Sequence, residues 1–499
     1  MAVQLPSDLD PRTPVIVGVG QLVHREPDSP EPAALMAEAV QLAELDSSAS
    51  GLIARAGVVA AVPTMTWRYR DPARIVADRI GATDAATWYV TVGGNSPQRM
   101  LNKLAVEIAR GALDVGVLCG AEAGRTKAAA RRNGTHLGWT VQGEDVAPDW
   151  SDGAPLLMGH EVEIERGILL PTQCYPLFEN ALWHESGCSL SEHLEVIGEM
   201  WAGFSRVAAA NPYAFRREAY TAEEITTPTA DNRMVAFPYT KRMVSNPDVD
   251  MSSGLVICSA EAAARHGVPI DRWVFLRAGT DGTDVKMSER PDFVSSASIG
   301  VAGRRVLELA GTDIDSVTHL DLYSCFPSAV QLALRELDIT PDRQLTVYGG
   351  LSFAGGPWNN PVGHAIASMV DVLRDDPGSL GLVTANGGVL DKHAFGVFST
   401  TPPRGGFLYD CPQDEIDSRG AHEVVGDHVG PAAIETWTVL HRAREWAGSS
   451  ASGVSDPTRR ANLGVERGRG ADATRRARGH DRHDGRDRRR PHGPPDLTG

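Results

Sequence analysis

The hydrophobic positions of this chain alternate between short apolar runs and stretches with helical spacing. Residues 14–20 (PVIVGVG) are apolar throughout, which is typical of a strand buried on both faces. In residues 31–44 the apolar side chains, among them Leu35, Met36 and Val40, recur every three or four positions, as on one face of a helix. The alternation of such segments predicts an α/β fold with a mainly parallel sheet covered on both faces.

The same alternation continues in two long segments of the chain. In the first segment we expect strands at 56–62, 88–93 and 115–119 and helices at 71–80 and 96–110. In the second segment we expect strands at 254–259, 273–278, 318–323, 381–385 and 394–399, and helices at 260–266, 298–310, 327–337 and 361–374. The pattern therefore predicts two similar α/β halves, built from residues 1–124 with 246–270 and from residues 271–429.

Residues 125–245 interrupt this alternation. They are rich in Trp, Pro, Asn and Tyr, with helical patterns near 186–209 and 213–219. We interpret them as a loop domain inserted into the first half.

The C-terminal part has a different composition. Residues 434–441 alternate like a strand, so we expect a further, incomplete domain to begin within 430–447. Residues 451–499 contain no Ile, Phe, Tyr, Met, Lys or Cys, which predicts a disordered, Arg-rich tail over 448–499. Two interpretations stay open, a basic tail or the product of a GC-rich gene read out of frame.

Composition and charge narrow the class of protein. The 499 residues are 42% hydrophobic and 22% charged, which excludes wholesale disorder, a coiled coil and a collagen-like fibre. Residues 442–499 hold 14 Arg and 8 acidic residues, so the net charge of −16 becomes −22 for residues 1–441. A body this acidic is a poor candidate for nucleic-acid binding.

Three features predict a cytoplasmic protein. No run approaches 18 apolar residues, so we expect no membrane span. The N-terminal residues have no basic region followed by an apolar core, so we expect no secretory signal. Six scattered cysteines without a CxxC pair predict reduced thiols.

Glycine-rich turns mark four segments that share a known pattern. They are residues 91–96 (TVGGNS), 321–326 (DLYSCF), 349–357 (GGLSFAGGP) and 384–388 (TANGG). Together with Asn246, the DMSSG run at 250–254 and the two-half layout, they resemble the thiolase superfamily over about residues 12–400. A subgroup of actinobacterial thiolase-like proteins, named acetyl-CoA acetyltransferases, has similar GGNSP, FAGGP and KHA motifs.

The resemblance implies a five-layered αβαβα fold and an acyltransferase that acts on acyl-CoA. It also implies a homodimer or higher homo-oligomer, no bound cofactor, and a CoA thioester as substrate or ligand. In this chemistry a cysteine at a helix N-terminus attacks the thioester, a histidine serves as general base and a second cysteine moves a proton.

This sequence departs from the thiolase pattern at each reactive group. The nucleophile falls on Gly94 or Asn95, the histidine on Gly356, the second cysteine on Ala385 and the water-polarising group on Tyr323. We therefore interpret the chain as a CoA-thioester binder or an enzyme repurposed for another acyl-transfer or lyase reaction. The alternative is a non-catalytic scaffold or partner subunit.

The resemblance also marks the residues expected to line the pocket. The predicted substrate-binding residues are Gly94, Asn95, Ser96, Tyr323, Ser324, Gly355, Gly356, Asn359, Asn386 and Gly387. No metal site is predicted, because His184, Cys188 and His193 fall in an expected helix and lack a fourth ligand.

Four side chains are candidates for chemistry, each with a structural alternative. Cys325 is a substitute nucleophile or a buried small apolar group. His364 is a general base or a helix-packing residue, and His393 lines the pocket in place of the second cysteine or belongs to a turn. Ser96 is an acyl acceptor or, like Asn95, a helix N-cap.

Overall fold

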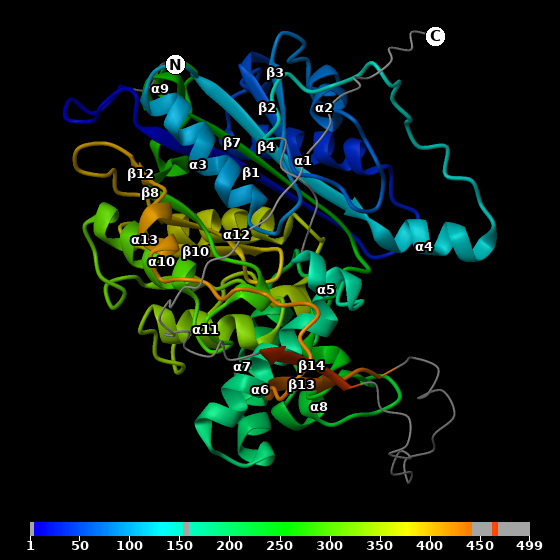
Figure 1. The fold of residues 1–499 in the computed structure, drawn as a ribbon. Helices are drawn as coiled ribbons and strands as arrows, with labels where there is room; N and C mark the ends of the chain where they lie inside the picture. The colour runs from blue at the N-terminus through cyan, green and yellow to red at the C-terminus, as the bar shows by residue number, and fades with distance from the viewer. Residues whose placement is uncertain (1–3, 153–158, 442–461, 468–499) are drawn as a thin grey trace, which may run out of the picture.

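One mixed sheet runs through the molecule, which we describe from a computed structural model covering residues 4–152, 159–441 and 462–467 (Figure 1). Its strand order is β3-β2-β4-β7-β1-β8-β11-β10-β9, with β12 paired to β8. The strands are β1 Pro14–His24, β2 Val58–Ala61, β3 Ala86–Tyr89, β4 Val115–Ala123, β7 Asp250–Ser259, β8 Val274–Thr283, β9 His319–Asp321, β10 Gly381–Gly387, β11 Lys392–Ser399 and β12 Leu408–Asp410.

The strand pairing repeats itself in the two halves. In the first half β1 pairs with β7 and β7 with β4, both antiparallel, and β4 pairs with β2 in parallel. In the second half β8 pairs with β11 and β11 with β10, both antiparallel, and β10 pairs with β9 in parallel. The two similar α/β halves predicted from the sequence are confirmed, and they join where β1 pairs with β8. The prediction of a mainly parallel sheet is wrong, because the long strands β1, β4, β7, β8, β10 and β11 pair with one another antiparallel.

The helices form three layers around the two half-sheets. Helices α1 and α2 cover the outer face of the first half, and α10 with α11 cover that of the second. Helices α3 and α12 lie between the halves and contact strands of both, with Leu101, Leu104, Ile366 and Met369 fully buried. The helices are α1 Pro32–Ser47, α2 Pro72–Ile80, α3 Ser96–Ala109, α9 Ala260–Arg265, α10 Ala297–Ala310, α11 Pro327–Glu336 and α12 Pro361–Asp375. The fold is therefore the expected five-layered αβαβα.

Local sequence explains where several of these elements begin. Asp71 caps α2, since its carboxylate accepts a hydrogen bond from the Arg74 N–H at 3.0 Å. Gly20 lets α1 lie close on β1, because a Cβ there would sit 2.1 Å from the Ala39 carbonyl oxygen.

The third expected strand ends earlier than its apolar run. The Tyr89 N–H donates to the Trp150 carbonyl at 3.0 Å, and the Thr91 N–H donates to Asp152 Oδ1 at 2.8 Å. A segment about sixty residues further along the chain thus takes the hydrogen bonds that would have extended β3.

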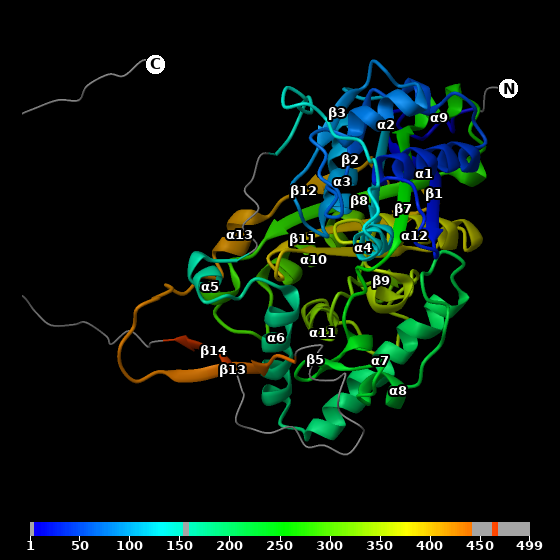
Figure 2. The same cartoon turned by 90° about the vertical axis from the view of Figure 1, so that its right-hand side faces the viewer.

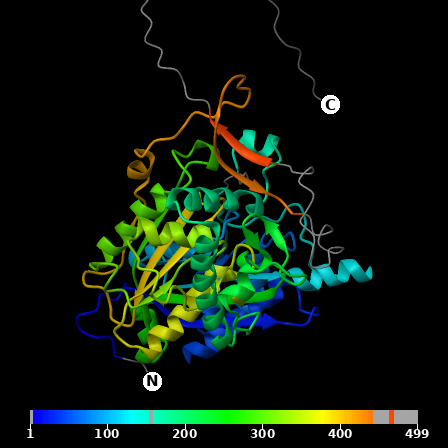
Figure 3. The ribbon, with the colours of Figure 1, turned by 90° about the horizontal axis from the view of Figure 1, so that it is seen from below.

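The chain between β4 and β7 leaves the sheet and forms mostly helices, of which α4 projects from the body (Figures 1 and 3). The elements here are α4 Gly124–Asn133, α5 Glu161–Glu165, α6 Pro171–Ser186, α7 Leu190–Ala210, α8 Ala222–Thr226, β5 Met234–Ala236 and β6 Tyr239–Thr240. The helix expected near 213–219 is wrong. There the N–H groups of Phe215 and Arg216 donate to the carbonyls of Ala354 and Phe353, which holds the backbone in an irregular path.

The C-terminal strand β13, Ala433–Val439, lies against α6 (Figure 2). The Thr436 hydroxyl donates to the Leu177 carbonyl at 2.6 Å, and Trp437 stacks on Phe237 at 5.2 Å between ring centroids. Before it lies α13, Gln413–Asp417. Strand β14, Asn462–Arg467, pairs with β13 inside the region predicted to be disordered; the rest of 448–499 lies outside the described residues. The domain boundaries remain predictions.

Candidate functional site

The structure brings together the glycine turn before α3 and three other marked segments. A Cβ on Gly94 would meet Tyr323 and Asn386, and the Gly93 N–H donates to Asn359 Oδ1 at 2.9 Å. Residues more than 200 positions apart therefore share one centre at the N-terminus of α3, as the resemblance implies.

The nucleophile position has no room for a side chain. A Cβ on Gly94 would lie 2.1 Å from the Tyr323 hydroxyl and 2.5 Å from the Asn386 carbonyl oxygen. The amide of Asn95 fills the adjoining space, since a Cβ on Gly93 or on Gly387 would each lie 2.3 Å from Asn95 Oδ1. The Tyr323 phenol and the Asn386 backbone therefore leave no space beside Gly94.

The histidine position is packed in the same way. A Cβ on Gly356 would lie 1.9 Å from Ser245 Oγ, and the Gly356 N–H donates to the Asn246 carbonyl at 2.9 Å. Gly355 has a φ of +119°, and a Cβ there would lie 2.5 Å from Met251 Sδ. The segment before β7 therefore fills the space beside Gly356.

A small cavity lies at the centre. Its volume is about 10 Å³, and Tyr323, Ala385, Asn386 and His393 are among its lining residues. A space of about this size holds a single water molecule. An acyl group can enter only if side chains move apart.

The Cys325 thiol is poorly suited to nucleophilic attack. Burial raises its pKa to about 12, so the neutral thiol dominates at neutral pH. The side-chain amide nitrogen of Asn386 lies 3.9 Å from its Sγ and donates to the Tyr175 hydroxyl at 3.0 Å. Tyr175, which no sequence motif marks, is thus part of the centre.

The two candidate histidines lie in different surroundings. His364 on α12 is fully buried, with Nδ1 2.9 Å from Gln21 Oε1 and its ring stacked on Tyr348. Burial lowers its pKa to about 3, and its Nε2 has no hydrogen-bond partner. His393 lines the small cavity, and its Nε2 lies 3.1 Å from the Leu390 carbonyl. Burial lowers the pKa of His393 as well, so both rings are neutral at pH 7.

Three predicted polar residues hold backbone at this centre. The Ser96 hydroxyl donates to the Thr91 carbonyl at 2.9 Å, and Ser324 Oγ accepts from the Leu351 N–H at 3.2 Å. The Asn359 amide spans Gly93 and the Pro63 carbonyl. These side chains hold the loops of the centre in place. Each of these hydrogen bonds occupies a backbone N–H or carbonyl group, which is then not free to bind a ligand.

Sequence reasoning missed the packing partners Ser245 and Tyr175, which lie in no recognisable motif, so only the folded chain identifies them. Asn360 belongs to the loop at 358–360 that the sequence marks as a source of amide donors. In the structure it donates to the Gly120 carbonyl at 2.8 Å and to Ser253 Oγ at 3.0 Å.

Metal and membrane features are absent from the part of the chain that the structure describes. No group of three His, Cys, Asp or Glu side chains in residues 4–152, 159–441 and 462–467 could hold a metal ion. All six cysteines are free thiols. Within the same residues, no helix is long and apolar enough to cross a bilayer.

Comparison with known proteins gives likenesses among solved structures. No family model matches the chain. No curated protein matches it either. It is similar to a monomeric SCP2-thiolase like protein type 1 from Mycobacterium smegmatis, with 33% identity over 87% of each chain and a TM-score of 0.74.

Two more distant structures share the fold. The Ltp2–ChsH2(DUF35) aldolase is 19% identical, with a TM-score of 0.60 over 81% of this chain and 99% of that one. The human mitochondrial 3-ketoacyl-CoA thiolase is 14% identical, with a TM-score of 0.56 over 78% of this chain and 100% of that one. With the repeated strand order and the shared centre, the mycobacterial likeness shows that this chain belongs to the thiolase superfamily, among the SCP2-thiolase-like proteins.

Proposed function

We propose that the protein binds CoA thioesters and does not catalyse thiolysis or Claisen condensation. The observation that supports this most strongly is the Tyr323 hydroxyl, 2.1 Å from where a Cβ on Gly94 would lie. The acetyl-CoA acetyltransferase activity that the family resemblance implies needs a thiolate at that point.

The remaining groups do not replace the missing ones. Gly356 and Ala385 stand where the base and the second cysteine would be, and burial keeps the Cys325 thiol neutral by raising its pKa. Loss of a nucleophile and its base typically lowers the rate by on the order of 10³-fold or more. We therefore expect thiolysis at the background rate.

The N-terminus of α3 supports the binding of a thioester. Helix α3 has 14 residues, and no side chain caps its first N–H groups. Its dipole favours a carbonyl or thioester oxygen there. Because the cavity is about 10 Å³, we infer that Tyr323 rotates away when a thioester enters.

The first experiment has a kinetic arm and a binding arm. Purified protein is assayed with acetoacetyl-CoA and CoA, beside Cys325→Ser, and we expect both at the uncatalysed rate. Rapid turnover in both proteins would overturn the proposal. Calorimetry with acetyl-CoA and longer acyl-CoAs should show binding; no binding at millimolar concentration would favour the scaffold or partner-subunit alternative.

A second candidate function is aldol cleavage of a 3-hydroxyacyl-CoA. It is favoured by Tyr323 and His393, which line the same small cavity, and by the aldolase among the fold neighbours. Neutral His393 would take the hydroxyl proton as the Cα–Cβ bond breaks and a carbonyl compound leaves. Burial keeps the pKa of Tyr323 well above its ordinary value, so its phenol would protonate Cα of the thioester enolate.

The aldol candidate has its own assay. A 3-hydroxyacyl-CoA should yield a shorter acyl-CoA and a carbonyl compound, separable by chromatography. Tyr323→Phe and His393→Gln should each abolish the product, while Tyr213→Phe, at an exposed tyrosine, should not. Equal product from wild type and both site variants would remove this candidate.

The oligomeric state stays a prediction. A homodimer follows from the superfamily resemblance, whereas the mycobacterial neighbour is described as monomeric.

A further inference from the structure

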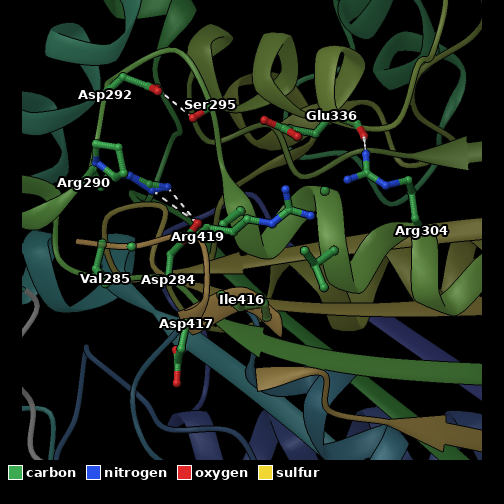
Figure 4. Close-up of a pocket in the computed structure, with 15 residues that line it drawn as sticks. Asp284, Val285, Arg290, Asp292, Ser295, Arg304, Glu336, Ile416, Asp417 and Arg419 are labelled. Atoms are coloured by element: carbon green, nitrogen blue, oxygen red, sulfur yellow. Dashed lines mark hydrogen bonds and ion pairs between the residues drawn. The ribbon is translucent and has the colours of Figure 1, made fainter. Parts of the chain in front are cut away.

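A second, larger cavity lies on the other side of the first turn of α10 (Figure 4). Its volume is about 250 Å³, and it is enclosed by the loop after β8, by α10 and by the ends of α11 and α13. Its lining includes Asp284, Arg290, Arg304, Glu336, Ile416 and Arg419. The cavity is separate from the thiolase centre and shares none of its lining residues.

A buried arginine forms one wall of the cavity. Arg290 is only 2% exposed, and its Nη2 donates to Asp284 Oδ2 at 3.0 Å and to the Leu390 carbonyl at 3.1 Å. Its Nε has no hydrogen-bond partner. An unpaired donor on a buried guanidinium is costly, so a ligand atom that accepts from Nε would relieve that cost.

The Asp284 carboxylate beside Arg290 already accepts hydrogen bonds from other groups of the protein. Asp284 Oδ2 also accepts from the Ser296 hydroxyl at 2.7 Å and the Ser298 N–H at 3.3 Å. Arg290 and Asp284 thus neutralise each other. The charge offered to a ligand then depends on Arg304 and Arg419 and on the carboxylates of Asp292, Glu336 and Asp417.

Two further guanidinium groups point toward each other across this space in Figure 4. Arg304 donates to the Glu336 carbonyl at 2.7 Å. Arg419 forms an exposed ion pair with Glu415 on α13, with Nη2 3.7 Å from Oε1. Two exposed guanidinium groups that face each other favour an anion between them.

The floor of the cavity leaves room for a ligand to lie close to the backbone of α10. A Cβ on Gly300 would lie 2.6 Å from Glu336 Oε2 and 3.0 Å from Arg304 Nη2, so glycine keeps this place open. Glu336 Oε1 accepts from the Ser296 N–H at 2.9 Å, which holds that carboxylate against the backbone. Asp292 and Asp417 also line the cavity, so a ligand with a single anionic group fits better than a polyanion.

We propose that this cavity binds a small organic anion through one phosphoryl or carboxylate group, held between Arg304 and Arg419 and reaching toward Arg290 Nε. Planar guanidinium groups bind both kinds of oxyanion in bidentate geometry. The volume of about 250 Å³ exceeds the cavity of about 150 Å³ that holds benzene, so a small metabolite fits and a whole CoA does not. The proposal does not rest on the CoA-thioester function.

The test uses calorimetry on the full chain with three probes, acetate and propanoate in one arm and methyl phosphate in the other. Arg304→Gln and Arg419→Gln should each raise the dissociation constant of the bound probe at least tenfold. The control Arg305→Gln changes a neighbouring arginine on α10 that pairs with Glu308, Asp410 and Glu415 and does not line the cavity. It should leave the affinity unchanged.

The outcomes separate the two ligand chemistries. Binding of methyl phosphate alone assigns a phosphoryl group, and binding of the carboxylates alone assigns a carboxylate. Gly300→Leu, which fills the floor without removing charge, should abolish binding in either case. No binding of any probe at 10 mM, or equal loss in Arg305→Gln, would overturn the proposal.

Discussion

The two cavities beside the first turn of α10 differ in volume about 25-fold and in the character of their walls. Ile299 faces the small one at the thiolase centre, and Gly300 and Val301 face the large one. At the centre, neighbouring side chains fill the space beside Gly94 and Gly356. At the large cavity, arginines and carboxylates surround open space. The comparison contrasts a tightly packed centre with an open, charged cavity on the other side of the same helix turn.

The largest expected effect comes from restoring the nucleophile. Gly94→Cys should lower the free energy of unfolding by at least about 3 kcal/mol, because its Cβ would overlap the Tyr323 hydroxyl and the Asn386 backbone. Urea denaturation measures this. Gly203→Ala is the control, since its Cβ would meet only Arg206 Nη2, at 3.7 Å. A Gly94→Cys protein as stable as wild type would show that the centre is not closed.

Restoring a side chain at the histidine position should cost less. Gly356→Ala should destabilise by about 1–3 kcal/mol, because the Cβ would lie 1.9 Å from Ser245 Oγ, a movable atom. Ser245→Ala removes that atom, so the double variant should recover most of the loss. Additive effects of the two substitutions in a double-mutant cycle would contradict this packing.

The buried His364 should make the fold sensitive to acid. Unfolded histidine takes up a proton near pH 6.5, whereas burial holds the pKa of His364 at about 3 in the folded state. Between these values the unfolded state binds more protons, so stability is lost as the pH falls from about 6.5 toward 3. In the His364→Gln variant the midpoint of urea unfolding should depend less on pH over this range. An unchanged pH profile would mean that the ring is accessible to water.

The smallest effect concerns thiol reactivity. Cys325 is buried and Cys411 is exposed. Burial raises the pKa of both thiols, so the difference between them is access to the reagent. Iodoacetamide at pH 8 should label Cys411 in the native protein and leave Cys325 unlabelled until the protein unfolds. Peptide mass spectrometry reads out both sites. Rapid native labelling of Cys325 would restore it as a candidate nucleophile.

The sequence predicted most of the fold because each element carries its own signal. Residues 14–20 are a continuous apolar run, and Asp71 is a capping residue directly before a periodic helix. The exceptions depend on distant partners. Residues 213–219 have helical periodicity, yet their N–H groups bond to Phe353 and Ala354. The apolar run after Tyr89 instead meets Trp150 and the segment beyond it.

The sequence motifs mark the residues of the centre but do not predict how closely their side chains pack. The motifs marked Gly94, Tyr323 and Asn386, which the structure places side by side, while their role as a binding site stays a prediction. That the Tyr323 ring fills the space beside Gly94 depends on side-chain orientation across 229 positions of sequence, which no local pattern encodes. The large cavity was missed for a similar reason, because its arginines come from a loop, a helix and the residues after α13.

The most direct test of a centre closed by Tyr323 is acyl-CoA calorimetry on Tyr323→Ala beside wild type. Removing the ring opens space next to the α3 N-terminus without adding a reactive group. We predict that acetyl-CoA binds Tyr323→Ala at least tenfold more tightly than wild type, with thiolysis still at background. Equal affinity in the two proteins, or weaker binding in the variant, would contradict the account.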